Sequence, residues 1–265
     1  MAAILPMEQF LIRKIVPLPP IMIPGYGPVD LSITNAVLFM FISAGVIAVF
    51  LALAARRQVV PGRMQAAAEM LYGMIDGTLT GAIMGERGRA YMPFVFTLFV
   101  FIAAMNLIGL LPGGFTVTSQ LAVTAALAIL TMVLVIVVGF ARNGLRFFKL
   151  FVPSGMPFAI VPVMALIEFI SFSVRPLTLS MRLFGNMLGG HVMTYMFGAF
   201  VVGMALWGIA GAGLVKIGLL GSVGSFLVIV ALLFLEVTVA VLQAFIFAAL
   251  ACIYLNEVVN LDHGH

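Results

Sequence analysis

Hydrophobic residues along the chain gather into stretches long enough to cross a membrane. About 20 apolar residues in a helix span roughly 30 Å of hydrocarbon. The sequence predicts such helices at 33–54, 90–111 and 118–141. The tight turn Pro112-Gly113-Gly114 joins the last two into an antiparallel hairpin. The proline-rich residues 1–30 predict an extended arm that precedes a single membrane domain at 31–265.

Residues 63–86 carry a different pattern, a single polar stripe at helical spacing. Its members are Gln65, Glu69, Tyr72, Asp76 and Thr80. The opposite side is apolar, so we expect an amphipathic helix that lies in the membrane interface. A short connector helix in solvent is the alternative.

Two further hydrophobic runs are too long for an ordinary crossing. Residues 157–203 would form an ideal helix about 70 Å long, and a perpendicular crossing uses less than half of that length. Residues 214–257 repeat the anomaly, and the glycine-rich link at 208–213 joins the two runs. We therefore expect a hairpin of two strongly tilted or near-horizontal helices that lie beside a large partner.

The composition places the chain among integral membrane proteins. It is 64% hydrophobic and 8% charged, with a mean hydropathy of +1.26, whereas soluble domains carry about 25% charged residues. The predicted fold class is an all-α polytopic membrane protein. One cysteine, Cys252, excludes an internal disulfide, and three histidines argue against a metal site. We expect no cofactor and no cleavable signal peptide.

Basic residues cluster in the short loops, and their placement predicts the orientation of the chain. They are Arg56, Arg57, Arg63, Arg87 and Arg89, and then Arg142, Arg146 and Lys149. By the positive-inside rule, residues 55–89 and 142–149 lie on the cytoplasmic side, and the arm and the turn at 112–117 lie outside. The net charge of +4 follows from this orientation and does not indicate nucleic-acid binding.

A polar face runs along the first of the two long helices, within roughly 80° of arc. Its members are Glu168, Ser171, Arg175, Thr178, Arg182, Asn186 and Gly189. Intramembrane ionisable residues nearly always face a bundle interior or a water-filled cavity. Ordinary helix packing is the alternative for Ser171 and Thr178, and interface anchoring is the alternative for Arg175 and Glu168.

Arg182 is the most costly residue of this face. Its guanidinium cannot lose its proton, and a charge at mid-bilayer costs between ~2.5 and ~17 kcal/mol. A water-filled path or a carboxylate partner must offset that cost. An ion pair with a carboxylate of the same chain is the alternative to a partner protein.

Glu236 lies midway along the last helix, without a charged residue of its own chain nearby in the sequence. Such a carboxylate suits a proton carrier; His191 is its candidate partner, and Gln243 lies on its face. Structural hydrogen bonds or packing are the alternatives. Glu257 either forms a functional pair with Glu168 or is a solvated acid near the C-terminus. Acids thus lie at two levels along the two long helices, and the permanently charged Arg182 lies between them. This arrangement predicts two half-channels that are bridged by a moving carboxylate of a partner.

Three segments together resemble the signature segments of the subunit a family of F-type ATP synthases. They are Asn106-Leu-Ile-Gly-Leu-Leu-Pro112, Arg182-Leu-Phe-Gly-Asn-Met187 and Leu242-Gln-Ala-Phe-Ile-Phe247. The resemblance covers most of residues 30–260. It implies a stator subunit that lies against a ring of c subunits, with Arg182 meeting the carboxylates of the ring.

The resemblance also implies two groups of channel residues. The outer half-channel takes Asn106, Asn186, His191, Glu236 and Gln243. The inner half-channel takes Glu168, Ser171, Arg175 and Glu257. Some bacterial members exchange the acid and the histidine at 191 and 236, so this chain resembles the alphaproteobacterial and mitochondrial branch, as does its loop at 152–157. Gly109 stands where some members have an acid, so no carboxylate role carries over there.

The sequence thus predicts a proton-translocating stator subunit that is not catalytic alone, since it has no phosphate-binding loop. Expected partners are the c-ring, the subunit b peripheral stalk, other ATP synthase subunits and membrane lipids, with no nucleic acid. The expected location is the bacterial inner membrane, with the N-terminus outside and the C-terminus cytoplasmic; the mitochondrial inner membrane is the alternative. A self-contained transporter or channel would predict two related halves, and a scaffold would not explain the polar face.

Overall fold

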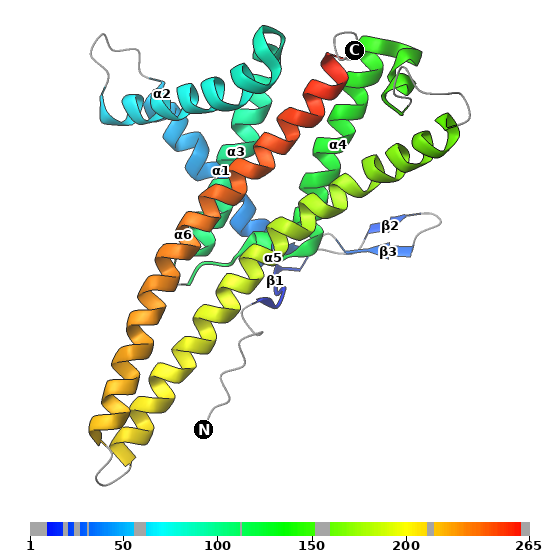
Figure 1. Cartoon of the computed structure of the whole chain (residues 1–265). Coiled ribbons are helices and arrows are strands. Elements are labelled where there is room, and N and C mark those ends of the chain that lie inside the picture. The colour runs from blue at the N-terminus through cyan, green and yellow to red at the C-terminus, as the bar shows by residue number, and fades with distance from the viewer. Residues whose placement is uncertain are drawn as a thin grey trace. The chain divides into compact units, whose positions relative to one another are not determined.

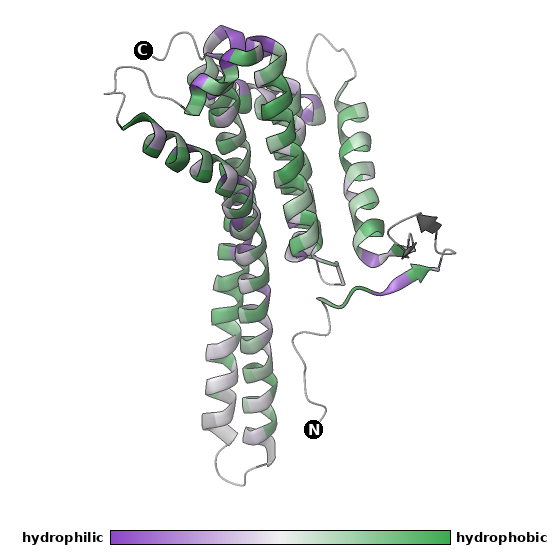
Figure 2. Cartoon of the chain, turned by 90° about the vertical axis from the view of Figure 1, so that its right-hand side faces the viewer, coloured by the Kyte–Doolittle hydropathy of each residue, from purple (hydrophilic) through white to green (hydrophobic). Residues whose placement is uncertain are grey.

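Long helices make up most of the computed structural model, which describes residues 10–17, 21–23, 27–30, 32–55, 62–111, 113–151, 160–210 and 215–260. The α-helices are α1 (Asn35–Ala54), α2 (Arg63–Ile75), α3 (Met92–Gly109), α4 (Leu121–Asn143), α5 (Val161–Ala210) and α6 (Val215–Val259) (Figure 1). In the described part of the chain, five helical stretches are long and apolar enough to cross a membrane. Figure 2 shows that the helices are hydrophobic along most of their length. The predicted all-α polytopic fold is confirmed.

The chain divides into two compact units. Unit 1 comprises Met1–Ser43, Met105–Gln120 and Phe184–Leu242. Unit 2 comprises Ala44–Ala104, Leu121–Leu183 and Gln243–His265. The long helices α5 and α6 each contribute a segment to both units.

The arm in unit 1 forms two short antiparallel ribbons where the sequence predicted an extended chain. β1 (Lys14–Val16) pairs with β4 (Ile33–Thr34), and β2 (Ile21–Ile23) pairs with β3 (Gly27–Val29). Asn35 ties the arm to the start of α1: its Oδ1 accepts the Arg13 amide at 3.2 Å, and its Nδ2 donates to the Leu11 carbonyl at 3.0 Å. The arm is therefore attached to a membrane helix by hydrogen bonds as well as by the chain.

Within unit 1, the later part of α5 and the earlier part of α6 form an antiparallel hairpin, visible in both views (Figures 1 and 2). Their backbones approach closely because glycines meet: a Cβ on Gly218 would lie 2.3 Å from the Gly208 Cα. Further along, a Cβ on Gly221 would lie 2.7 Å from the Met204 sulfur. Small residues at such an interface let two membrane helices pack tightly.

Unit 2 changes helix type where the sequence predicted one interfacial helix over 63–86. After α2, the chain forms a π-helix at Asp76–Met84 and a 3₁₀-helix at Gly85–Tyr91 before α3 begins. Thr80 is buried although it belongs to the predicted polar stripe, and its hydroxyl is satisfied by donating to the Asp76 Oδ1 at 2.8 Å. Gly81 permits the wide turn, since a Cβ there would lie 2.9 Å from the Asp76 carbonyl oxygen.

An aromatic cluster follows α4 in unit 2. Gly144, with φ of 53°, ends the helix, and a 3₁₀-helix at Gly144–Phe151 turns back so that the Phe147 ring lies over Gly139. Asn143 Nδ2 donates to the Val258 carbonyl at 2.6 Å. This bond attaches the end of α6 to the end of α4.

Some sequence predictions fall on residues that lie outside the described ones. They concern Arg56, Arg57, Pro112, the loop at 152–157 and part of the glycine-rich link at 208–213.

Candidate functional site

A cavity of about 250 Å³ in unit 1 gathers three of the predicted outer-channel residues. Asn186 and His191 on α5 and Glu236 on α6 line it, together with Gly189 and Gly190. The helix hairpin brings these residues together although they are as much as 50 positions apart in the chain. The polar lining of the cavity therefore comes from two helices, and Leu110 after α3 completes the wall.

Glu236 is almost completely buried against the backbone of α5, with an exposed fraction of 7%. Thr194 Oγ1 donates to its Oε1 at 2.9 Å, and its Oε2 is buried without a hydrogen-bond partner among the described residues. A Cβ on Gly190 would lie 2.8 Å from Oε1. The carboxyl group thus occupies space that only a glycine leaves open.

His191 lies in the same cavity lining, but its hydrogen bond goes elsewhere. Its Nε2 lies 2.8 Å from the Thr116 Oγ1, and the Phe10 ring contacts the imidazole edge to face at a centroid distance of 6.3 Å. The sequence suggested Glu236 as its partner; the two residues share the cavity, and no hydrogen bond joins them in the described structure. His191 is thus held by the α3–α4 turn and by the arm.

Asn106 is fully buried and joins three segments of unit 1. Its Nδ2 donates to the Ala240 carbonyl at 3.0 Å, and its Oδ1 accepts from the Thr118 hydroxyl at 2.8 Å. It therefore links α3, the turn before α4, and α6. Gln243, the fifth predicted outer residue, is buried on the part of α6 that belongs to unit 2.

The predicted inner residues meet around one arginine in unit 2. Arg175 is half-buried and forms ion pairs with Glu257 and, at 3.4 Å, with Glu168. Its guanidinium carbon also lies 4.8 Å from the centroid of the Tyr254 ring. Glu257 is therefore paired with Arg175 and is also partly exposed to solvent.

Arg182 has an exposed side chain and forms no ion pair or hydrogen bond with any described residue. The same-chain ion pair considered from the sequence is therefore absent from the described structure. Ser171, Thr178, Asn186 and Gly189, which share its predicted face, are exposed as well. The face predicted by helical spacing is thus open to a partner along most of its length.

Three threonines of unit 1 were missed by the sequence reasoning. Thr116 contacts His191, Thr118 contacts Asn106, and Thr194 contacts Glu236. A helical period cannot relate the first two to their partners, because they lie in a turn and their contacts depend on tertiary packing. Two hydroxyl residues in a turn between two membrane helices were the available signal.

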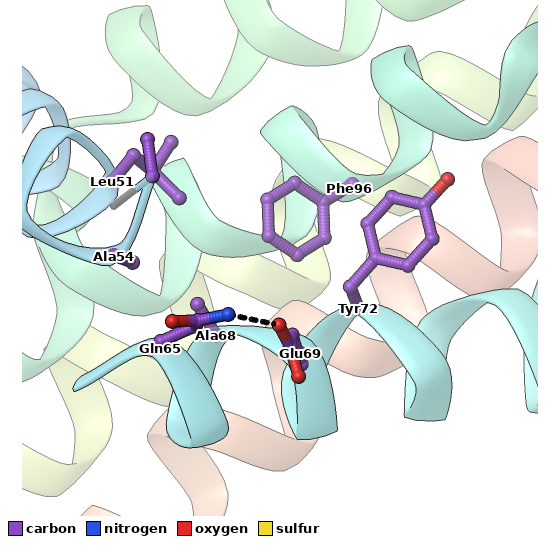
Figure 3. Close-up of a pocket in the computed structure, with 8 residues that line it drawn as sticks. Leu51, Ala54, Gln65, Ala68, Glu69, Tyr72 and Phe96 are labelled. Atoms are coloured by element: carbon purple, nitrogen blue, oxygen red, sulfur yellow. Dashed lines mark hydrogen bonds between the residues drawn. The ribbon is translucent and has the colours of Figure 1, made fainter. Parts of the chain in front are cut away.

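A second cavity, of about 310 Å³, lies in unit 2 between the end of α1, α2 and α3 (Figure 3). Gln65 Nε2 donates to the Glu69 Oε1 at 2.8 Å at its edge, and the Tyr72 ring lies against the Phe96 ring. The remaining lining is apolar. This cavity contains none of the predicted channel residues.

Comparison with known proteins agrees with these features. The profile of the family described as ATP synthase A chain matches residues 37–256. A protein named ATP synthase subunit a from Rhizobium johnstonii is 46% identical over 261 residues, covering 98% of each chain. Proteins of the same name from Agrobacterium fabrum and Rhodopseudomonas palustris are 45% and 43% identical, covering 97% of this chain and 98% of their own. The resemblance predicted from the sequence is confirmed, and the chain belongs to the ATP synthase A chain family.

Proposed function

We propose that this chain is the proton-translocating stator subunit of a rotary ATP synthase in the bacterial inner membrane, and that Arg182 meets the carboxylates of a moving c-ring. The observation that carries the role of Arg182 is its exposure on a hydrophobic helix without a partner in the described part of the chain. A permanent charge in that position requires a counter-charge or water. A carboxylate that arrives on another subunit supplies the counter-charge only when it is deprotonated.

The outer half-channel is assigned to Asn106, Asn186, His191, Glu236 and Gln243. The cavity between α5 and α6 supports this assignment, because it holds His191 and Glu236 with Asn186 in one lining. A proton that enters from outside passes His191 to Glu236, which hands it to a ring carboxylate. The buried Glu236 Oε2, which has no hydrogen-bond partner among the described residues, can take up that proton without breaking an existing bond.

The inner half-channel is assigned to Glu168, Ser171, Arg175 and Glu257. The two acids are about one-third exposed, at 33% and 31%, so they can exchange protons with water. Arg175 forms ion pairs with both carboxylates and so holds them together. After the ring has turned, its carboxyl group releases the proton toward this pair.

Arg182 separates the two paths. Its fixed charge repels a hydrated proton and attracts a deprotonated ring carboxylate, so a proton crosses only when it travels on the ring. Each charge that crosses gains ~2.3 kcal/mol per 100 mV of membrane potential. ATP chemistry belongs to other subunits of the complex.

The proposed orientation places the arm and the α3–α4 turn outside and the C-terminus in the cytoplasm. Exposed basic residues support it at both cytoplasmic loops, namely Arg63, Arg87, Arg89, Arg142, Arg146 and Lys149. The arm at 1–30 lies on the outer side of one membrane domain at 31–265. The c-ring and the subunit b stalk are the proposed direct partners.

The test is ATP-driven proton pumping by the purified complex in vesicles, with Arg182→Ala in place of the wild-type chain. We expect coupled pumping to be abolished while the complex still assembles. Arg146→Gln is the matched control, because Arg146 is also exposed and lies in a loop. Unchanged pumping by Arg182→Ala would refute the stator mechanism.

Glu236→Gln tests the outer path separately. The amide keeps the shape of the side chain and cannot carry the proton, so transport should slow while assembly is retained. Normal turnover at every pH would remove Glu236 from the path.

A further inference from the structure

We propose that Thr116 is a positioning residue for His191, and that its hydroxyl sets which imidazole nitrogen is free to exchange a proton in the outer path. The proposal rests on the proposed function, since it takes His191 as a member of that path. It adds a polar residue of the α3–α4 turn to a site whose other polar residues lie on α5 and α6.

The geometry places one hydroxyl between two partners. Thr116 is 6% exposed, and its Oγ1 lies 2.8 Å from the His191 Nε2 and 3.3 Å from the Gly109 carbonyl oxygen. A hydroxyl has one proton to donate and two lone pairs with which to accept. It can therefore donate to only one of these two partners at a time.

Each choice fixes a different state of the histidine. When the hydroxyl donates to the Gly109 carbonyl, it accepts from Nε2–H, and Nδ1 is left with the lone pair that takes up a proton. When the hydroxyl donates to Nε2, the ring proton must sit on Nδ1. The imidazolium ion carries a proton on both nitrogens, and the hydroxyl again accepts from Nε2–H.

Rotation of one hydroxyl thus satisfies Nε2 in every protonation state of His191. A buried nitrogen that loses its partner in one of these states carries a desolvation cost. Removing the Thr116 hydroxyl would leave Nε2 buried without this partner. The states of His191 that depend on the bond would become rarer, and proton transfers that pass through those states would slow. The neighbouring acid, Glu236, is the other titratable residue in the cavity lining, and it does not replace Thr116 as the hydrogen-bond partner of Nε2.

The surroundings hold Thr116 and the ring in this relation. The Thr116 carbonyl accepts from the Ser119 hydroxyl at 2.6 Å, which fixes the turn. A Cβ on Gly109 would lie 3.0 Å from both the Cα and the Oγ1 of Thr116, so the glycine allows the turn to approach α3. The Phe10 ring lies against the imidazole and limits its rotation.

The experiment compares Thr116→Val and Thr116→Ser in the whole complex. Valine keeps the shape and lacks the hydroxyl, so we expect ATP-driven proton pumping to fall about fivefold, the effect of one lost hydrogen bond to a buried group. Serine restores the hydroxyl, so pumping should return to near the wild-type rate. Thr131→Val is the matched control, because Thr131 is also buried and its hydroxyl donates to the Leu127 carbonyl of its own helix.

A double variant distinguishes positioning from a general structural effect. If Thr116 acts through His191, Thr116→Val should cause no further loss of pumping in a His191→Ala background. A further fivefold loss in that background would overturn the proposal. So would normal pumping by Thr116→Val, or failure of Thr116→Ser to restore the rate.

The same set of variants distinguishes failure of this proposal from failure of the proposed function. Normal pumping by His191→Ala would contradict the outer path itself. Impaired pumping by His191→Ala together with normal pumping by Thr116→Val would overturn only the role of Thr116. If neither Thr116→Val nor Thr116→Ala assembles into the complex, Thr116 is a structural residue and the proposal is wrong.

Discussion

The Thr194 hydroxyl donates a hydrogen bond of 2.9 Å to one oxygen of the Glu236 carboxyl group, and the other oxygen is buried without a partner in the described structure. The two carboxyl oxygens are therefore chemically unequal. The bonded oxygen orients the group, and the second oxygen is the one at which a proton can be added or removed. A membrane carboxyl held in this way has one fixed end and one reactive end.

We predict that Gly190→Ala will impair proton transport by moving this carboxyl group. The new Cβ would lie 2.8 Å from Oε1 and 3.1 Å from the Cγ of Glu236, so the acid must shift by several tenths of an ångström. Small misplacements of a reacting group reduce rates markedly, and we expect a loss of roughly threefold to tenfold in ATP-driven pumping by reconstituted complex.

Gly198→Ala is the matched control for this variant. Gly198 lies on the same helix, and a Cβ there would meet nothing within 4 Å. Alanine is the better helix former by about 0.5–1 kcal/mol, so Gly198→Ala should assemble at least as well as the wild type. Equal pumping rates for the two variants would contradict the role given to Gly190.

Hydropathy was sufficient to predict the membrane helices, and helical spacing placed the polar residues of α5 on one face. Transmembrane length follows from the thickness of the bilayer, and the face follows from the period of an α-helix, so neither requires knowledge of tertiary contacts. Ser171, Thr178 and Arg182 are exposed, as are apolar residues on other sides of α5 such as Leu166 and Ile170, so exposure alone does not single out this face. Arg182 is the residue for which the sequence was most informative, because its cost in a membrane is independent of the fold.

The type of helix and the contacts between helices could not be predicted from hydropathy and helical spacing. The π-helix at Asp76–Met84 arises where Gly81 leaves room beside a backbone carbonyl, and it buries Thr80, which an α-helical period places on the polar stripe. The contact between Arg175 and Glu257 joins residues on different helices. Spacing along one helix places each of them on a face but does not say which acid meets which base.

A pH-dependent prediction concerns the arm, outside the membrane-spanning helices. The Lys14 ammonium and the Ser32 hydroxyl and amide donate to the Asp30 carboxylate and hold its pKa well below the usual range. A carboxyl whose pKa is lowered by folding stabilises the folded form above its ordinary pKa, and that contribution is lost as the pH falls through the folded value. The bond between Lys14 and Asp30 should therefore persist in moderately acidic solution.

We expect Asp30→Asn to lower amide hydrogen-exchange protection in the arm at neutral pH, by less than about threefold because the pair is exposed. The difference between the variant and the wild type should shrink only in strongly acidic buffer. Protection factors from hydrogen-exchange mass spectrometry measure this directly. A difference that disappears already near pH 5 would contradict the lowered pKa.

The ion pairs of Arg175 predict a stability effect that is separate from proton transport. Arg175→Gln leaves two carboxylates of like charge near each other, without the guanidinium that joins α5 to α6 in unit 2. Breaking a fully buried pair costs about 3–5 kcal/mol, and the partial exposure of both acids reduces this to about 1–3 kcal/mol. We expect this subunit to dissociate from the complex at a lower temperature or at a lower concentration of denaturing detergent.

The double variant Arg175→Gln with Glu257→Gln should recover part of that loss, because it removes the acid that Arg175→Gln leaves unpaired. Arg146→Gln, which removes an exposed arginine from the loop after α4, should change the dissociation temperature little. If Arg175→Gln dissociates no more readily than Arg146→Gln, the ion pairs contribute nothing to holding the two helices. In that case the ion pairs of Arg175 act in proton transport alone, which pumping rates of the Arg175→Gln complex would test.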